Sequence, residues 1–299
     1  MRIWITGDFH RNIRDLHLRC NIAGVKPGDL VIVAGDDCLN YYCDLSDDMV
    51  KKSVNTWGID FLFVNGNHQN KPENISTYKP VEWNGGTVLK QEGFDHLNFA
   101  VDGEIYTIQG KTYAICGGAY SVDKYYRALR GAMQWPNLIS SDDFSYLEKV
   151  VTDSTFDFDK KIADRIVKRI PSKFCFWWAD EQPSTKTKKK FEENLAAHGW
   201  KVDYVVTHTC PYKFIPTEMF LPNLNQDTVD NKTERWLAGI ERKLKYGAWY
   251  AGHYHTDKRI GNFHLLYRSM VQMSRVRPVK VEEPVEQDDD VLQETESSL

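Results

Sequence analysis

Five short polar clusters, each directly after an apolar run, constrain the fold of this chain more than any other feature. The clusters are Gly7-Asp8-Phe9-His10, Gly35-Asp36, Gly66-Asn67-His68, Thr207-His208 and Gly252-His253-Tyr254-His255. They hold five of the nine histidines, so these side chains are concentrated and not scattered. Each apolar run is typical of a buried strand, and ligand-binding residues collect at strand ends in open α/β sheets.

The first part of the chain alternates strand and helix patterns. Apolar runs predict strands at 3–5, 30–34 and 61–64, and helical spacing predicts helices over 12–20 and 47–57. Continuous apolar strands of this kind suit a sheet that is covered on both faces. The β-α-β-α-β order therefore predicts an α/β fold.

The later elements have weaker patterns. Two turn signals, Asp102-Gly103 and Gln109-Gly110, predict a short antiparallel meander over residues 96–119. Helices are expected within 141–170, over 184–198 and over 231–246. Strands are expected at 202–206, 249–251, 265–267 and 270–276. Asn231 and Glu234 resemble a capping box at the start of the last helix.

An aromatic-rich segment over residues 121–183 interrupts this pattern. The sequence predicts one domain over 1–278 that contains this insert, followed by an acidic, disordered tail over 279–299. Residues 281–299 include eight acidic and no basic side chains, so the formal charge of −4 becomes +4 without them. A mildly basic folded part suits a phosphate-bearing substrate. The tail could bind a partner, inhibit the site or only aid solubility.

The apolar run lengths, the N-terminal pattern and the cysteine spacing predict a cytoplasmic protein that has no membrane contact. No apolar run reaches the ~18 residues of a transmembrane helix, and a predicted strand stands where a secretory signal would begin. The six cysteines form no C-x-x-C pair, so we expect reduced thiols that mostly serve packing. Cys210 lies two residues after His208, so the alternative to a packing role for Cys210 is that it lines the site.

The polar clusters offer oxygen and nitrogen donors without thiolates. Asp8 and His10 are two residues apart, and alternate side chains of extended backbone share one face. His253 and His255 repeat this spacing. The other donors are Asp36, Asn67 and His208. Such a set suits divalent manganese, iron, zinc or nickel.

In this order the clusters resemble the calcineurin-like metallophosphoesterase superfamily, whose pattern runs D-x-H, G-D-x-x-D, G-N-H-D/E, a lone H and G-H-x-H. The match spans Asp8 to His255. The resemblance implies a four-layer sandwich, in which two mixed β-sheets are flanked by helices, with two metal ions at the sheet edge. It implies Asp8, His10, Asp36 and His255 for the first ion, and Asp36, Asn67, His208 and His253 for the second.

The resemblance also implies a chemistry, in which a hydroxide that bridges the two ions attacks phosphorus. His68 would stand outside the ion shell as the catalytic acid–base group. Two positions depart from the family pattern: Leu39 replaces an Asp or Arg, and Gln69 replaces the acidic residue that usually supports the histidine. We therefore expect His68 to be a weaker partner, or to use Asp37 or another carboxylate.

Four further residues are candidate substrate contacts. Arg11 directly follows the first cluster, and Arg127 follows Gly117-Gly118-Ala119-Tyr120-Ser121, where paired glycines permit a close backbone approach. Trp178 and Glu181 belong to an aromatic stretch that could stack on a base or gate the cleft. The alternatives are a hairpin with a basic end for the glycine stretch, and a small core of the insert for the aromatic one.

We expect a metal-dependent phosphodiesterase or phosphomonoesterase. The aromatic insert and the mild basicity favour a nucleotide or nucleic-acid phosphoester as its substrate. Two alternatives are open. A binding scaffold of the same fold would turn over slowly, and Gln69 leaves that possibility. A phosphoprotein phosphatase is disfavoured because no Asp-Arg-Gly follows Gly35-Asp36.

Overall fold

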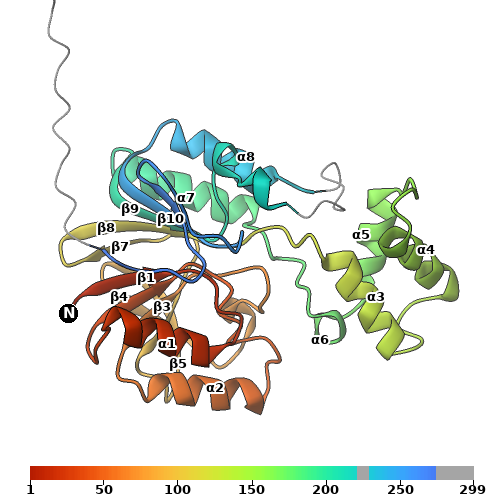
Figure 1. The fold of residues 1–299 in the computed structure, drawn as a ribbon, viewed down its shortest axis with the longest axis horizontal. Coiled ribbons are helices and arrows are strands. Elements are labelled where there is room, and N and C mark those ends of the chain that lie inside the picture. Colours follow the sequence, from red (N-terminus) through yellow and green to blue (C-terminus); the bar gives the residue numbers. More distant parts are fainter. Residues whose placement is uncertain (221–228, 274–299) are drawn as a thin grey trace, which may run out of the picture.

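The fold of this protein is a four-layer α/β sandwich with an additional group of helices at one side (Figure 1). The computed structural model describes residues 1–220 and 229–273. Within them, two mixed β-sheets face each other and helices cover both outer faces. The predicted fold class is therefore confirmed. The predicted acidic tail and the end of the 270–276 strand lie outside the described residues.

The first sheet has seven strands within the described part of the chain, in the order β13-β1-β2-β3-β6-β5-β4. Its central strands are parallel: β1 (Ile3–Thr6), β2 (Leu30–Val33), β3 (Asp60–Phe63) and β6 (Leu97–Ala100). The flanking strands are antiparallel: β13 (Met270–Gln272), β5 (Gly86–Gln91) and β4 (Tyr78–Trp83). Every residue of β1 and β2 is buried, as expected for parallel strands that are covered on both faces.

The second sheet has six strands among the same residues, in the order β11-β12-β10-β9-β8-β7. Its parallel strands are β8 (Lys111–Cys116), β9 (Lys201–Thr207), β10 (Lys245–Ala251) and β12 (Phe263–Leu265). The outer strands β7 (Ile105–Ile108) and β11 (Lys258–Ile260) are antiparallel. The two sheets meet where their parallel strands end. There, Nδ1 of His208, which follows β9, donates a hydrogen bond to the carbonyl of Ala34, which follows β2.

Apolar cores fill the spaces between the layers. The core between the sheets includes the fully buried Ile5, Ile32, Leu62, Ile115 and Val206. Helices α1 (Ile13–Ala23) and α2 (Leu45–Asn55) pack on the outer face of the first sheet. Helices α7 (Thr185–Ala197) and α8 (Lys232–Glu241) pack on the outer face of the second. Short 3-10 turns occur at Pro72–Asn74, Tyr212–Phe214 and Thr217–Met219.

Four more helices form a group beside the sandwich (Figure 1). They are α3 (Lys124–Gln134), α4 (Ser141–Thr152), α5 (Lys160–Arg169) and α6 (Ser172–Cys175). The helix expected within 141–170 is thus two helices. The group surrounds its own apolar core, and Trp177 is part of that core. For Trp177, the structure supports burial in the insert over stacking on a base.

Residues 96–119 do not form the predicted meander. The strand β6 joins the first sheet, whereas β7 and β8 form a hairpin in the second. The chain changes sheets at the turn after Asp102, and Gln109 and Gly110 both have positive φ in the hairpin turn, which twists the strands in the favoured sense. The hairpin of β4 and β5 was not predicted from the sequence.

The two helices on the second sheet begin differently. Ser184 caps α7, since its side chain accepts a hydrogen bond from Thr187 N. Asn231 makes no side-chain cap bond at the start of α8, so the predicted capping box is wrong. Glu234 accepts instead from the Thr209 hydroxyl at 2.7 Å, because burial demands a partner for its carboxylate.

None of the described helices has the length and apolar content that crossing a bilayer requires. The six cysteines are free and five of them are buried. Cys210 is fully buried in the core beneath α7 and α8. The structure thus supports a packing role for Cys210.

The inter-sheet core generates a stability prediction. Ile32→Ala removes a fully buried side chain and should lower the free energy of unfolding by about 2–5 kcal/mol. Ile22→Ala is the matched control, since Ile22 is 78% exposed on α1 and should change it by less than about 0.5 kcal/mol. Urea unfolding monitored by circular dichroism measures both. Equal effects would contradict the assigned core.

Candidate metal centre

Seven predicted ligands lie in the loops that follow five parallel strands. Asp8 and His10 follow β1, Asp36 follows β2, Asn67 follows β3, His208 follows β9, and His253 and His255 follow β10. Loops that are distant in the sequence thus meet at one edge of the sandwich, as the polar clusters predict.

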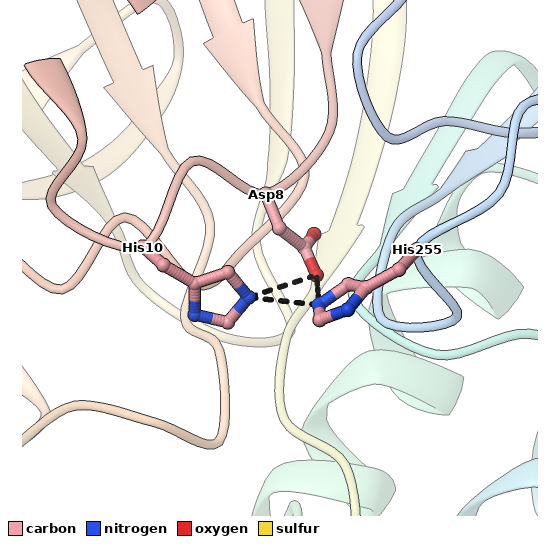
Figure 2. A group of neighbouring side chains, drawn as sticks. All are labelled: Asp8, His10 and His255. Carbon is pink, nitrogen blue, oxygen red and sulfur yellow. Dashed lines mark hydrogen bonds and ion pairs between the residues drawn. The ribbon is translucent and has the colours of Figure 1, made fainter. Parts of the chain in front are cut away.

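One group of donors consists of Asp8, His10 and His255 (Figure 2). The two Nε2 atoms of His10 and His255 are 2.8 Å apart. The Asp8 Oδ2 atom is 3.4 Å from Nε2 of His255 and 3.9 Å from Nε2 of His10. Their donor atoms all lie within 4.8 Å of one another, which is close enough for one ion to reach all three.

A second group of donors surrounds the amide oxygen of Asn67. This Oδ1 atom is 2.8 Å from Nε2 of His208 and 3.1 Å from Nδ1 of His253. Nε2 of His208 is also 3.5 Å from Oδ1 of Asp36. The group therefore offers two imidazoles, one amide oxygen and one carboxylate.

Asp36 faces both groups. Its Oδ1 atom lies toward His208, whereas its Oδ2 atom is 3.9 Å from Nε2 of His10. Burial would raise the pKa of Asp36, but the neighbouring His208 and His68 hold it well below its ordinary value. Asp36 is thus an ionised carboxylate with one oxygen toward each group.

The tautomer of His208 makes its free nitrogen an acceptor. Nδ1 of His208 donates to the Ala34 carbonyl at 2.9 Å, so in the neutral ring Nε2 carries a lone pair. That lone pair faces the Asn67 amide oxygen, which is also an acceptor. Burial acts to lower the pKa of His208, but Asp36 and Asp8 raise it to about 9. Either a proton or a cation must therefore lie between the two acceptors.

The burial of the carboxylates fits a divalent cation. Asp8 and Asp36 are 0% and 1% exposed, and within the described residues neither forms an ion pair with Lys or Arg. Two buried carboxylates without fixed positive charge are strongly unfavourable. The donor set, with hard oxygens and imidazoles, suits the ions expected from the sequence.

The sequence profile of the calcineurin-like phosphoesterases matches residues 1–257. The chain belongs to this family. The comparison with curated proteins found no match. Among solved structures, the chain is similar to a phosphopantetheinyl hydrolase from Mycobacterium tuberculosis, with 15% identity, a TM-score of 0.41, and coverage of 95% of this chain and 98% of that chain. Family membership and the donor groups support metal-dependent phosphoester hydrolysis.

The loops of this phosphoesterase bring their donors together through left-handed backbone. His10, Asp36, His253 and His255 have φ of 44°, 42°, 71° and 49°, a region that non-glycine residues rarely adopt. The expectation that Asp8 and His10 share a face of extended backbone is therefore wrong, because His10 lies in a turn. Strained residues of this kind persist where the surrounding structure holds them in that conformation, and they cluster at functional sites.

His68 lines the edge of the phosphoesterase site, with Nε2 3.9 Å from Oδ2 of Asp36. Its Nδ1 atom is buried without a hydrogen-bond partner in the part of the chain that the structure describes. Burial lowers the pKa of His68, with Asp36 opposing and Arg127 adding to the effect. Gln69 does not reach His68, because its amide donates to Asp37 at 2.7 Å and accepts from Cys38 N at 2.7 Å. The carboxylate that faces His68 is Asp36 and not Asp37.

Two of the four predicted substrate contacts are arginines that already have partners. Arg11 pairs with the buried Asp47. Arg127 pairs with Asp123 at 2.6 Å and donates to the Tyr41 hydroxyl at 3.2 Å. Arg127 also lines a cavity of about 310 Å³ that Tyr42 and Phe176 share. As substrate contacts, both arginines stay predictions.

The other two predicted contacts are buried. Trp178 and Glu181 are 6% and 5% exposed. Trp178 meets the Tyr41 ring edge-on at 5.8 Å, and Glu181 accepts from Nε1 of Trp177 at 2.7 Å. As substrate contacts they also stay predictions.

Sequence reasoning missed why glycine precedes Asn67. A Cβ atom on Gly66 would lie 1.9 Å from Oδ1 of Asp36 and 2.3 Å from its backbone nitrogen. Only glycine leaves room for the carboxylate that faces both donor groups. The Gly-Asn pair in the sequence was the available signal.

Gly66→Ala should therefore displace Asp36 and abolish the binding of divalent metal. Gly239→Ala is the matched control, because a Cβ atom on Gly239 meets nothing within 4 Å. Elemental analysis of each purified variant after loading with manganese measures the bound ions. Wild-type metal content in the Gly66 variant would contradict the packing argument.

Proposed function

We propose that this phosphoesterase hydrolyses a nucleotide or nucleic-acid phosphoester with two divalent ions. The first ion would be held by Asp8, His10, Asp36 and His255, and the second by Asp36, Asn67, His208 and His253. The observation that carries the proposal is that two donor groups share Asp36 at one sheet edge, inside the region that matches the family. Manganese, iron, zinc and nickel all suit the donor set.

When bound, such a pair supplies a nucleophile at neutral pH and offsets the charge of the phosphoryl oxygens. The residues of this chain orient the donors. The Ala34 carbonyl keeps the lone pair of His208 at Nε2, and backbone N–H groups of Asn67 and His68 donate to Oδ1 of Asp36 at 2.9 Å each. These bonds fix the donors before substrate arrives, so little reorganisation is needed during the reaction.

His68 is the proposed acid–base residue. It lines a cavity of about 320 Å³ together with Asn67, His253 and His255. Burial favours the neutral imidazole, but a phosphate anion beside it would favour the protonated form again. In that form His68 donates a proton to the leaving oxygen or a hydrogen bond to a phosphoryl oxygen.

The same cavity supports a substrate with an apolar, planar part. Besides the donors, it is lined by Tyr120, Val122, Met219, Phe220 and Val229. Its size falls at the low end for small-ligand sites, which span about 300–1,000 Å³. A nucleoside phosphate offers the matching combination, with an anionic group for the metal donors and a base for the apolar side chains.

Loss of Asp36 should remove metal and activity together. Asp36→Asn keeps the volume but removes the charge that both donor groups share, so we expect fewer than two ions for each chain and no measurable hydrolysis. Elemental analysis combined with hydrolysis of bis-p-nitrophenyl phosphate in manganese tests this. Two bound ions with wild-type turnover would overturn the shared role of Asp36.

Loss of His68 should separate metal binding from turnover. His68→Ala should retain both ions and lower kcat by roughly 10²–10⁴-fold, as expected for a general acid. His198→Ala is the control, since His198 is the C-cap residue of α7 and its side chain bonds the carbonyl of Asn194. A His68 variant with wild-type kcat would end the assignment.

A substrate panel tests the proposed substrate class. It comprises p-nitrophenyl phosphate, bis-p-nitrophenyl phosphate, nucleoside monophosphates, cyclic nucleotides, short oligonucleotides and a phosphopeptide, each with manganese, zinc, nickel or magnesium. We expect the highest kcat/KM on one of the nucleotide-containing substrates. Preference for the phosphopeptide would favour a phosphoprotein phosphatase, and metal binding without turnover on any ester would favour a binding scaffold.

A further inference from the structure

Two chain segments meet beside Asn67, and their glycines, Ser121 and Glu181 have no part in the proposed function. These segments link the helices α3–α6 to the sandwich. The outgoing segment (residues 117–123) carries Gly117, Gly118 and Ser121, and the returning segment (residues 176–183) carries Glu181. The hydrogen bond between Ser121 and Glu181 joins the two segments.

The paired glycines allow this close approach. A Cβ atom on Gly117 would lie 2.2 Å from the carbonyl oxygen of Asn65, in the loop that carries Asn67. Gly118 has φ of +85°, and a Cβ atom there would lie 2.4 Å from the carbonyl oxygen of Glu181. The outgoing segment is thus packed between the Asn67 loop and the returning segment, with Gly118 N donating to Asn65 O at 2.8 Å.

A chain of buried hydrogen bonds runs from Asn67 to Trp177. Asn67 Nδ2 donates to Oγ of Ser121 at 2.9 Å. The Glu181 carboxylate accepts from both the hydroxyl and the backbone N–H of Ser121, and from Nε1 of Trp177 at 2.7 Å. Asn67, Ser121 and Glu181 are each at most 5% exposed, so water cannot replace these partners.

The direction of these bonds determines how the Asn67 amide is turned. A serine hydroxyl has one proton. Burial raises the pKa of Glu181 to about 7. In its ionised form Glu181 takes that proton, and the hydroxyl oxygen then accepts from Asn67. The NH2 group of Asn67 must then face Ser121, which leaves Oδ1 toward His208 and His253. If the amide were reversed, the NH2 group of Asn67, which cannot bind a cation, would face the position of the second ion.

We propose that Ser121 and Glu181 are positioning residues that hold the amide oxygen of Asn67 toward the second ion. The inference rests on the proposed two-metal function. It gives the two segments one shared role, because Gly117 and Gly118 allow the outgoing segment to approach the Asn67 loop and Ser121 and Glu181 orient the ligand. Partners that orient metal ligands typically change metal affinity by 10–100-fold when they are removed.

The test is the affinity of metal-free protein for manganese, measured by calorimetric titration together with the number of ions bound. Ser121→Ala and Glu181→Leu should each weaken one of the two ions by about 10–100-fold and leave the other within a few-fold. Because Glu181 acts through Ser121, the double variant should lose no more affinity than the more affected single variant.

Asp143→Leu is the matched control. Asp143 is a partly buried carboxylate of α4 that pairs with Arg169 of α5 at 2.7 Å. Its loss perturbs the same helices without removing a member of the chain of bonds from Asn67, so both affinities should be unchanged. If the control weakens one ion as much as Glu181→Leu does, the effect belongs to the stability of the helices and the proposal fails.

Two further results would overturn the positioning roles. One is wild-type affinity for both ions in the Ser121→Ala variant. If the Glu181 variant does not fold, the Ser121 variant alone tests the proposal. The other is a double variant whose loss equals the product of the single losses. If wild-type protein binds no manganese, the proposed two-metal function fails instead, so the two failures are distinguishable.

Discussion

The structure depends on the burial of two carboxylates where two sheets meet. Asp8 and Asp36 end adjacent parallel strands and are almost fully inaccessible. Isolated carboxylates at such depth would be far too unfavourable, so their surroundings must supply positive charge. Imidazoles from both sheets surround them, and two divalent ions would complete the compensation. The metal centre and the packing of the two sheets therefore depend on each other.

Strands and loops contribute to this arrangement in different ways. Parallel strands with apolar cores on both faces hold the loop origins rigidly, and the loops then turn through left-handed backbone to aim the side chains. Backbone strain of about 1–3 kcal/mol at each such residue is tolerable only because the cores on either side are well packed. The helices α3–α6 contribute at a distance, through linking segments that contact the Asn67 loop.

Much of this could be predicted from the sequence. The order of the polar clusters identifies the fold, and the structure brings the seven predicted ligands to one edge, because strand ends in parallel sheets share an edge. The turn at His10 could not be predicted, since an Asp-x-His spacing is equally compatible with extended backbone. The role proposed for Glu181 could not be predicted either, because hydrogen bonds between residues 121 and 181 depend on how the linking segments pack. The capping box predicted for Glu234 was wrong for the same reason, since Glu234 bonds a tertiary partner, Thr209, instead of the helix start.

The central claim is that Asp36 joins two ions in one cage. A crystal grown with manganese, with diffraction recorded at the manganese absorption edge, measures this directly. The account predicts two anomalous peaks for each chain, with the two oxygens of Asp36 contacting different ions and Asn67 Oδ1 contacting the second. A single peak, or two peaks without Asp36 between them, would contradict it.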